Sequence, residues 1–133
     1  MVLESLINTN RKENWCILDT SFILTCLRQK IDFFDEITLA GLNILIPQQV
    51  IKEIENLSES KKEAKVFLKL LEKEKNSFKR VDLKSKNVDK GIIRFAEKNK
   101  EIIVATLDKE IKDKTSNKKM VVRNKKTIEV IGN

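Results

Sequence analysis

The stretch Trp15-Cys16-Ile17-Leu18-Asp19-Thr20-Ser21 decides the fold that this sequence predicts. Its largely apolar first half leads directly into an acid and two hydroxyl residues. A short apolar run followed by helix-capping residues is typical of a buried parallel strand that leads into a helix. This pattern places Asp19 at the carboxyl end of a central strand, where open α/β sheets bind their ligands. The simpler interpretation is that Asp19 or Thr20 only caps the next helix, because caps prefer these residue types.

Apolar runs and helical spacings alternate along the rest of the chain. The apolar runs predict strands at 15–18, 42–46, 78–81, 101–105, 120–122 and 127–131, with the last two as short edge strands. Apolar residues at helical spacing lie between most of these runs. Asp32, Pro47 and the pair Ser60 and Glu63 are predicted to start three of the helices. The alternation predicts an α/β fold, a three-layer α/β/α sandwich with a mainly parallel central sheet of four to five strands.

The length of 133 residues suits one domain with a real core. Residues 15–133 are predicted to form that domain. Residues 1–14 are predicted to form an N-terminal helix and a polar linker. The helix is predicted from one apolar stripe, formed by Val2, Leu3, Leu6 and Ile7.

The composition excludes several kinds of chemistry. The chain has no His, so a His-based triad or a His metal site is excluded. Cys16 and Cys26 lie in apolar runs without metal-type spacing, so we expect buried, reduced thiols and a cytoplasmic location. The start of the chain lacks the pattern of a signal peptide, and no apolar stretch is long enough for a membrane helix, so no membrane partner is expected. The net charge of +7 favours an anionic partner, with nucleic acid ahead of a membrane surface; a Lys-rich solubility surface is the alternative.

Four acids share an unusual placement. Asp19 and Asp108 each follow a predicted strand, and Glu53 and Asp89 share the apolar side of their helices. Carboxylates normally occupy the solvated side of a helix, because unpaired burial is costly. Each of the four also lies in the first turns of a helix that leaves the sheet, and such positions converge on one crevice.

Four carboxylates in one crevice repel one another and need a cation. Oxygen ligands without His or thiolate select Mg²⁺ or Mn²⁺. A P-loop or a dinucleotide fingerprint would need glycines in a fixed pattern, and the only glycines are Gly41, Gly91 and Gly132.

The same residues resemble those of the PIN-domain ribonucleases. The resemblance rests on Asp19-Thr20-Ser21 after an apolar strand, Glu53 in Val50-Ile51-Lys52-Glu53-Ile54, Asp89 in Val88-Asp89-Lys90-Gly91-Ile92-Ile93, and Thr106-Leu107-Asp108 after a strand. It extends from about Trp15 to Ile131. It is strongest to single-domain archaeal and eukaryotic members related to the ribosomal RNA processing nucleases, whose Ala-Thr-Asn-Asp-Lys-Glu-Leu segment is similar to residues 105–111 here.

This resemblance implies a site that binds one or two Mg²⁺ or Mn²⁺ ions and cleaves single-stranded or structured RNA. It implies that Asp19, Glu53, Asp89 and Asp108 are the catalytic, metal-binding acids. It also implies supporting hydroxyls at Thr106, and less directly at Thr20 or Ser21. The sequence departs from many relatives at Lys90, where they have a second acid.

Basic residues crowd the segment that follows Asp108, and they are predicted to hold RNA phosphates with little sequence choice. The predicted RNA-binding residues are Lys109, Lys112, Lys118, Lys119, Arg123, Lys125 and Lys126. The alternative is a solvated lysine face.

The predicted function is thus a metal-dependent endoribonuclease with a role in ribosomal RNA processing. Two alternatives stay open: a toxin-type ribonuclease of a toxin–antitoxin pair, and a non-cleaving RNA-binding module of the same fold. A homodimer is compatible with each. So is a protein partner, either a ribosome assembly factor or an antitoxin.

Overall fold

The computed structural model describes residues 14–124 and 126–132. The predicted N-terminal helix and most of the predicted linker lie outside the described residues. Asn14, predicted as the end of the linker, is the first residue of the first strand. The strands are β1 (Asn14–Leu18), β2 (Leu42–Pro47), β3 (Phe78–Val81), β4 (Ile103–Ala105), β5 (Lys119–Arg123) and β6 (Thr127–Ile131). The helices are α1 (Thr20–Arg28), α2 (Phe33–Leu39), α3 (Gln48–Asn56), α4 (Lys62–Lys73), α5 (Val88–Lys98) and α6 (Lys109–Lys114).

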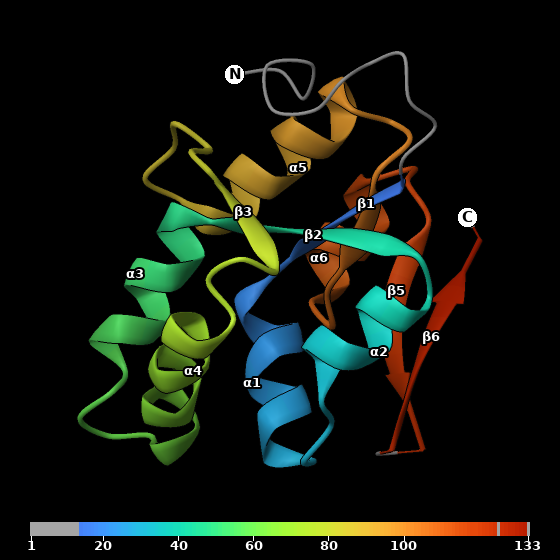
Figure 1. The fold of residues 1–133 in the computed structure, drawn as a ribbon. Helices are drawn as coiled ribbons and strands as arrows, with labels where there is room; N and C mark the ends of the chain where they lie inside the picture. The colour runs from blue at the N-terminus through green and yellow to red at the C-terminus, as the bar shows by residue number, and fades with distance from the viewer. Residues whose placement is uncertain (1–13, 125, 133) are drawn as a thin grey trace.

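The strands form one sheet in the order β3-β2-β1-β4-β5-β6 (Figure 1). Neighbouring strands from β3 to β5 are parallel, and β6 is antiparallel to β5. The mainly parallel sheet is confirmed, with six strands in place of the four to five predicted. β5 is not an edge strand, because it pairs with β4 on one side and β6 on the other.

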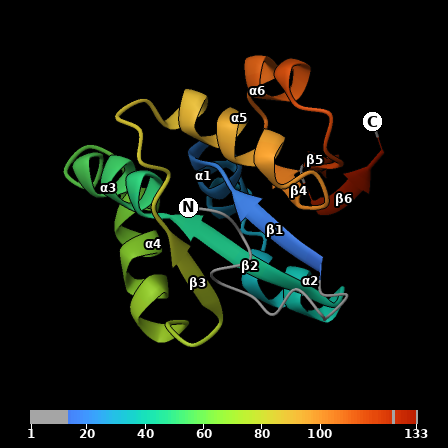
Figure 2. The same cartoon turned by 90° about the horizontal axis from the view of Figure 1, so that it is seen from above.

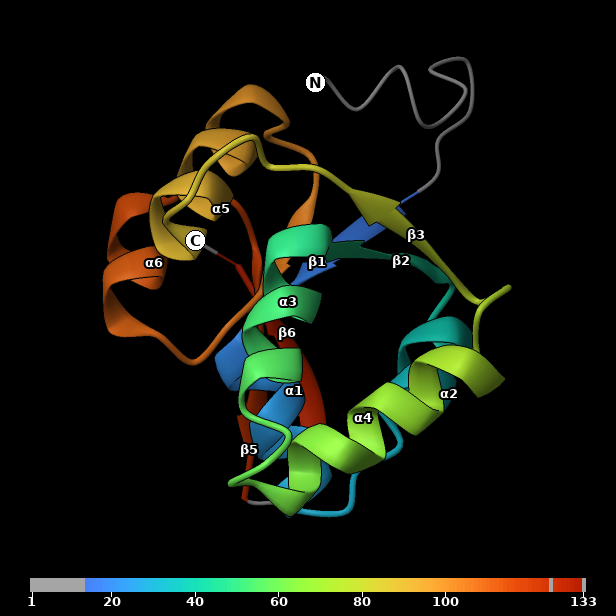
Figure 3. The ribbon, with the colours of Figure 1, turned by 90° about the vertical axis from the view of Figure 1, so that its left-hand side faces the viewer.

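Helices cover both faces of the sheet, as the three-layer prediction requires. Helices α1 to α4 gather on one face, where α1 contacts α3 and α4, and α2 packs on β2 (Figures 1 and 3). Helices α5 and α6 contact each other on the other face (Figure 2). This division follows from right-handed crossovers, because the chain moves outward along β1, β2 and β3 and then returns to β4 on the far side of β1.

The central strands are buried on both faces, which explains their continuous apolar runs. Residues Cys16 to Leu18 of β1 and Val104 and Ala105 of β4 are fully buried. Phe22 and Phe67 come from helices on one face and Ile92 from the other, and all three are fully buried. The core therefore fixes the ends of β1 and β4 rigidly side by side.

Two predicted helix starts differ in the structure. Asp32 caps α2 as predicted, because its side chain accepts from the Asp35 N–H at 3.1 Å. Pro47 ends β2 with an extended ψ of 140° and caps α3, so it stands one position before the predicted one. Ser60 forms no capping box, because Lys61 occupies the N-cap position of α4 without a side-chain capping bond, and the Ser60 hydroxyl donates to the Leu57 carbonyl at 3.3 Å.

Both cysteines are buried and free, as predicted. Burial raises the pKa of the Cys16 thiol far above its usual range. Burial, with a smaller contribution from the Glu36 charge, raises the pKa of Cys26 to about 12. Neither thiol therefore ionises at neutral pH. Within the described part of the chain, no helix has the length and apolar character needed to cross a membrane.

Candidate active site

The site lies where the strand order reverses. β1 leads to β2 on one side, whereas its other neighbour, β4, comes late in the chain. Ligands of open α/β sheets bind outside the carboxyl ends of the strands at such a point. Asp19 follows β1 and Thr106 follows β4, and the Asp19 N–H donates to the Ala105 carbonyl at 2.9 Å.

A network of hydroxyls holds the buried carboxylate of Asp19. The Thr106 hydroxyl donates to Asp19 Oδ2 at 2.8 Å, and the Ser21 hydroxyl donates to the same oxygen at 2.9 Å. Ser21 Oγ in turn accepts from the Leu107 N–H at 3.1 Å. Asp19 is only 3% exposed and Thr106 is fully buried. The network therefore joins the ends of β1 and β4 and fixes the carboxylate in one orientation.

Thr20 has a different surrounding from the other two predicted supporting hydroxyls. Its Oγ1 is buried and has no hydrogen-bond partner among the described residues. Its backbone N–H, rather than its hydroxyl, is the group of Thr20 that lowers the pKa of Asp19. The structure thus brings Ser21 and Thr106 onto Asp19 but gives the Thr20 hydroxyl no contact with it.

Burial has the largest effect on the pKa of Asp19. Burial raises its pKa, and the hydrogen bonds from Thr106, Ser21 and the Thr20 N–H lower it without reversing the direction. The nearby charge of Asp108 raises the pKa further. Asp19 and Asp108 are therefore close enough to repel each other.

Three carboxylates gather at the first turns of α5 and α6. Oxygens of Asp89, Asp108 and Glu110 all lie within 4.8 Å of one another. Asp108 caps α6, where its side chain accepts from the Ile111 N–H at 3.0 Å. Its own N–H donates to Thr106 Oγ1 at 3.0 Å, so the hydroxyl that holds Asp19 also sets the position of Asp108.

Glu53 lies at the rim of this acid cluster. It is exposed on α3 and does not belong to the three-carboxylate group. Burial raises the pKa of Asp89, and the charges of Asp108, Asp19, Glu53 and Glu110 raise it further, in that order. Glu53 therefore acts on Asp89 electrostatically, even though its own carboxylate stays in solvent.

Sequence reasoning did not select Glu110. This residue lies in the first turn of α6, two positions after Asp108, and its carboxylate also pairs with Lys114 at 3.1 Å. Helix spacing does not predict that Asp108 and Glu110 meet, because residues two apart do not share a helix face. Asp108 is a cap outside the helix, however, so the two carboxylates converge. A signal was present, since Glu110 stands in the segment that resembles PIN-domain ribonucleases.

The predicted RNA-binding residues separate into two groups. The prediction that Lys119 binds RNA at the surface is wrong. Lys119 is 5% exposed, and its ammonium donates to the carbonyls of Thr115 (2.9 Å) and Asn117. Burial also lowers the pKa of Lys119. Lys118 lines a hollow with Asn14 at the amino end of β1, away from the acids.

The remaining basic residues lie in α6 or in the β5–β6 hairpin. Lys109 pairs with Asp113 at 2.9 Å, and Lys112 is half-buried on the same helix. Arg123 pairs with Glu129 across the hairpin at 3.3 Å, and Lys126 is exposed in its turn. Lys125 lies outside the described residues. The side chain of Lys90, next to Asp89, is exposed.

The chemistry of the donor set suits a hard divalent cation. All the converging groups are carboxylates, and neither cysteine lies among them. Burial, and after it the charges of the neighbouring carboxylates, raise the pKa of Asp89, and a bound cation relieves such repulsion between like charges. The residues present therefore fit Mg²⁺ or Mn²⁺ better than a thiophilic metal.

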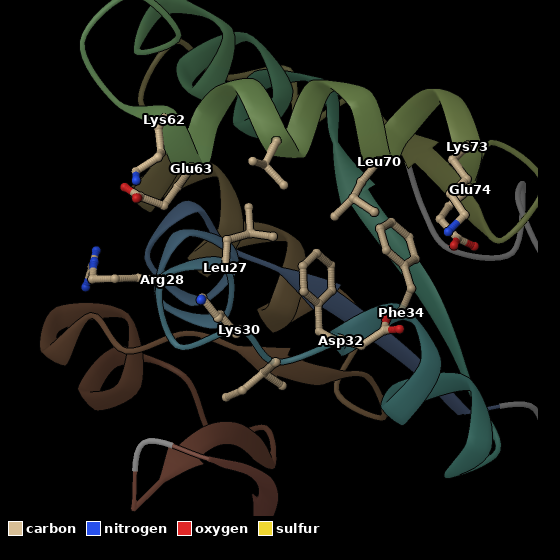
Figure 4. A pocket seen from close by; sticks show the side chains of 13 residues that line it. Leu27, Arg28, Lys30, Asp32, Phe34, Lys62, Glu63, Leu70, Lys73 and Glu74 are labelled. Atoms are coloured by element: carbon tan, nitrogen blue, oxygen red, sulfur yellow. The ribbon is translucent and has the colours of Figure 1, made fainter.

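A cavity of about 510 Å³ lies apart from this acid cluster (Figure 4). Its wall is formed by α1, the start of α2 and α4, and includes Leu27, Phe34 and Leu70 with charged residues at the rim. None of the predicted site residues lines it.

Comparison with known proteins gives consistent matches. The model of the PIN like domain family matches residues 16–126. The chain is similar to ribonuclease VapC4 of Methanocaldococcus jannaschii, with 34% identity over 123 residues that cover 86% of this chain and 94% of the relative. It is also similar in structure to the PIN domain endonuclease Utp24, with a TM-score of 0.73, 28% identity, and coverage of 89% of this chain and 93% of that chain.

Proposed function

The chain belongs to the PIN-like domain family, and on this premise we propose that it is a metal-dependent endoribonuclease that hydrolyses RNA phosphodiester bonds. One observation carries the proposal. Carboxylates of Asp89, Asp108 and Glu110 converge within 4.8 Å beside the buried carboxylate of Asp19, at the reversal point of a parallel sheet. The similarity to a protein named as a ribonuclease and to one named as an endonuclease supports it.

In this proposal Asp89, Asp108 and Glu110 hold one or two Mg²⁺ or Mn²⁺ ions, with Asp19 beside them. A bound ion neutralises phosphate charge and makes water a stronger nucleophile. The protein's contribution is orientation. Thr106 and Ser21 fix Asp19 in one rotamer, and the Ile111 N–H fixes Asp108. Ligands that are held in this way need no rearrangement when the ion and the substrate arrive.

Glu53 has a separate role in the proposal. It is exposed and lies outside the three-carboxylate group, so we assign it to orienting the attacking water rather than to anchoring an ion. Loss of Glu53 should therefore lower turnover more than it lowers metal affinity.

The RNA strand would be held by basic residues on the carboxyl side of the sheet. Lys109 and Lys112 lie within α6, which begins at the acids, and Arg123 and Lys126 lie at the far end of β5. Contacts of this kind bind phosphates without reading bases, so affinity should fall steeply with salt.

The biological setting stays a prediction of the sequence. Ribosomal RNA processing is the setting that the resemblance implies, and a toxin-type ribonuclease remains the alternative. A cytoplasmic location, a homodimer, and an assembly factor or antitoxin as protein partner also remain predictions.

The direct test is cleavage of an end-labelled RNA by the purified protein with Mn²⁺, with Mg²⁺ or with EDTA. We expect cleavage with either ion and none with EDTA. Glu110→Gln should reduce cleavage, whereas Asp113→Asn, which removes an exposed acid from the same helix, should not. Binding of RNA without cleavage under every condition would favour the non-cleaving module instead.

A further inference from the structure

Gln49 joins two elements that leave the sheet side by side. Pro47 of β2 pairs with Val81 of β3, so α3 and the segment 82–87 start at the same level of the sheet. Gln49 Nε2 donates to Asp82 Oδ1 at 2.7 Å, and Gln49 Oε1 accepts from the Leu83 N–H at 3.0 Å. Both ends of one side-chain amide are therefore used to hold the segment. Among the described residues, both hydrogen bonds between α3 and this segment come from Gln49.

The segment 82–87 is itself tightly built, so a shift at Asp82 is passed on. The Lys84 N–H donates to Asp82 Oδ1 at 2.8 Å, and Lys84 has a left-handed φ of 53°. The Ser85 hydroxyl donates to the Asn87 carbonyl at 2.8 Å, and the Asn87 side chain caps α5. Side-chain hydrogen bonds therefore order both halves of the segment that leads from Asp82 to the first turn of α5.

Gly91 shows how closely this segment packs on α5. A Cβ at Gly91 would lie 3.0 Å from the side chain of Leu83 and 3.1 Å from that of Ser85. The segment therefore lies directly against the turn that carries Asp89, and its position sets the position of Asp89.

Gln49 also shares a helix face with a site residue. Glu53 lies four positions after Gln49, so the two side chains project from the same side of α3. The charge of Glu53 is one of those that act on Asp89. The face that carries Glu53 is thus fastened, one turn earlier, to the segment that positions Asp89.

We propose that Gln49, through its paired bonds to Asp82 and Leu83, is a positioning residue that sets the separation of the Glu53 and Asp89 carboxylates. The proposal rests on the proposed function, because it assigns the residue a role in the same metal-binding site. A rigid bridge is needed there because like charges would otherwise move α3 and the first turn of α5 apart.

A donor–acceptor exchange tests this role. Gln49→Glu alone places two carboxylates against each other and breaks the bridge. Adding Asp82→Asn restores it with donor and acceptor exchanged, since the new carboxylate at position 49 accepts from both the new amide and the Leu83 N–H. Asp82 Oδ1 accepts from both Gln49 Nε2 and the Lys84 N–H, so a new amide nitrogen in its place restores the bond to position 49 but gives up the bond from Lys84. The net charge of the double variant equals that of the wild type, and Gln48→Glu is a matched control at an exposed neighbour.

The measurements are Mn²⁺ affinity by calorimetry, kcat and KM for RNA cleavage, and the melting temperature. We expect Gln49→Glu to weaken Mn²⁺ binding and to lower kcat by about 10- to 100-fold, the usual cost of losing a group that orients metal ligands. KM should change little. The double variant should bind Mn²⁺ more tightly and turn over faster than Gln49→Glu, but fall short of the wild type because it lacks the bond from the Lys84 N–H, and Gln48→Glu should match the wild type. Gln49→Ala, which adds no charge, should weaken Mn²⁺ binding in the same direction and serves if Gln49→Glu does not fold.

Two outcomes would overturn the proposal. One is wild-type Mn²⁺ affinity and kcat in both Gln49→Glu and Gln49→Ala. The other is a double variant that regains its melting temperature but not its Mn²⁺ affinity or kcat, which would make the bridge merely structural. Failure of the wild type itself to bind Mn²⁺ or to cleave RNA would instead refute the proposed function.

Discussion

Replacing Thr106 with valine tests whether hydrogen bonding, rather than packing, holds the Asp19 carboxylate. Valine keeps the shape of threonine but lacks the hydroxyl. Thr106→Val therefore removes the donor to Asp19 Oδ2 at 2.8 Å and the acceptor of the Asp108 N–H at 3.0 Å. Thr106 is fully buried and Asp19 is 3% exposed, so solvent has little access to replace the lost bonds.

The size of the effect follows from these two bonds. A hydrogen bond to a charged group contributes about 1.5–3 kcal/mol and one between neutral groups about 1 kcal/mol. The extra methyl group of valine offsets about 0.8 kcal/mol of this loss. We expect the free energy of unfolding to fall by about 2–3 kcal/mol at neutral pH, which lowers the melting temperature by roughly 6–12 °C for a domain of this length.

The loss should also depend on pH. Burial already raises the pKa of Asp19 above its ordinary value of 3.8, and the bond from Thr106 opposes that shift, so the variant should have a still higher pKa. An acid whose pKa is raised in the folded state loses stability as pH rises from its unfolded to its folded pKa. The loss in Thr106→Val should therefore be smallest at or below about pH 4 and complete at neutral pH.

The assay is urea unfolding in EDTA at several pH values, with Thr115→Val as the matched control. Thr115 is also buried, but its hydroxyl donates to the Ile111 carbonyl at 2.7 Å and touches no carboxylate. The control should lose about 1 kcal/mol at every pH. Equal losses of unfolding free energy in the two variants, independent of pH, would refute the view that the Thr106 hydroxyl stabilises the ionised carboxylate of Asp19.

Three further predictions follow from the same site. Asp19→Asn should abolish RNA cleavage and leave the circular dichroism spectrum unchanged; near wild-type cleavage would contradict its assignment. Mn²⁺ at about 100 times its dissociation constant should add about 2.7 kcal/mol of stability at pH 7, seen as a rise in melting temperature. The rise in melting temperature should be smaller in acid, because burial raises the pKa of Asp19 and Asp89 and protons then compete with the ion. A melting temperature that Mn²⁺ does not change at pH 7 would contradict the proposal that the acid cluster binds the ion. Lys112→Gln with Lys126→Gln should flatten the plot of log RNA affinity against log salt by about 0.7 per lost contact, measured with Ca²⁺ in place of Mn²⁺, and an unchanged slope would place the RNA elsewhere.

The central part of the fold could be predicted because its signals are local. The apolar run ending at Leu18 and the capping residues after it are enough to place Asp19 at a strand end. Asp89 and Asp108 of the four predicted acids lie in the three-carboxylate group, and the reason is that positions after parallel strands lie at one edge of the sheet; Glu53 is exposed and outside the group. Glu110 was missed because helix-face spacing, the rule used to select Glu53 and Asp89, does not apply to a residue that follows a cap.

The basic residues show where sequence distance from a site residue is a poor guide. Lys118 and Lys119 come soon after Asp108 in the chain, but Lys118 precedes β5 and Lys119 is its first residue, and β5 is parallel to β4. Residues that precede a parallel strand lie toward the amino edge of the sheet, whereas the acids lie beyond the carboxyl edge. The ammonium of Lys119 is instead used to bond carbonyls of the loop after α6, including that of Thr115.

The end of a strand is the better guide to which cations can reach the substrate. β5 pairs with β4 through Met120 and Ala105, so residues after Met120 extend past the level at which Asp19 and Thr106 leave the sheet. Arg123 and the turn that follows are therefore on the carboxyl side, as are the early residues of α6. A phosphate chain that crosses the acids would meet these positions before it met Lys118. For this reason the salt dependence of RNA binding should respond to Lys112→Gln with Lys126→Gln and not to Lys118→Gln, although Lys118 is closer than Lys126 to Asp108 in sequence.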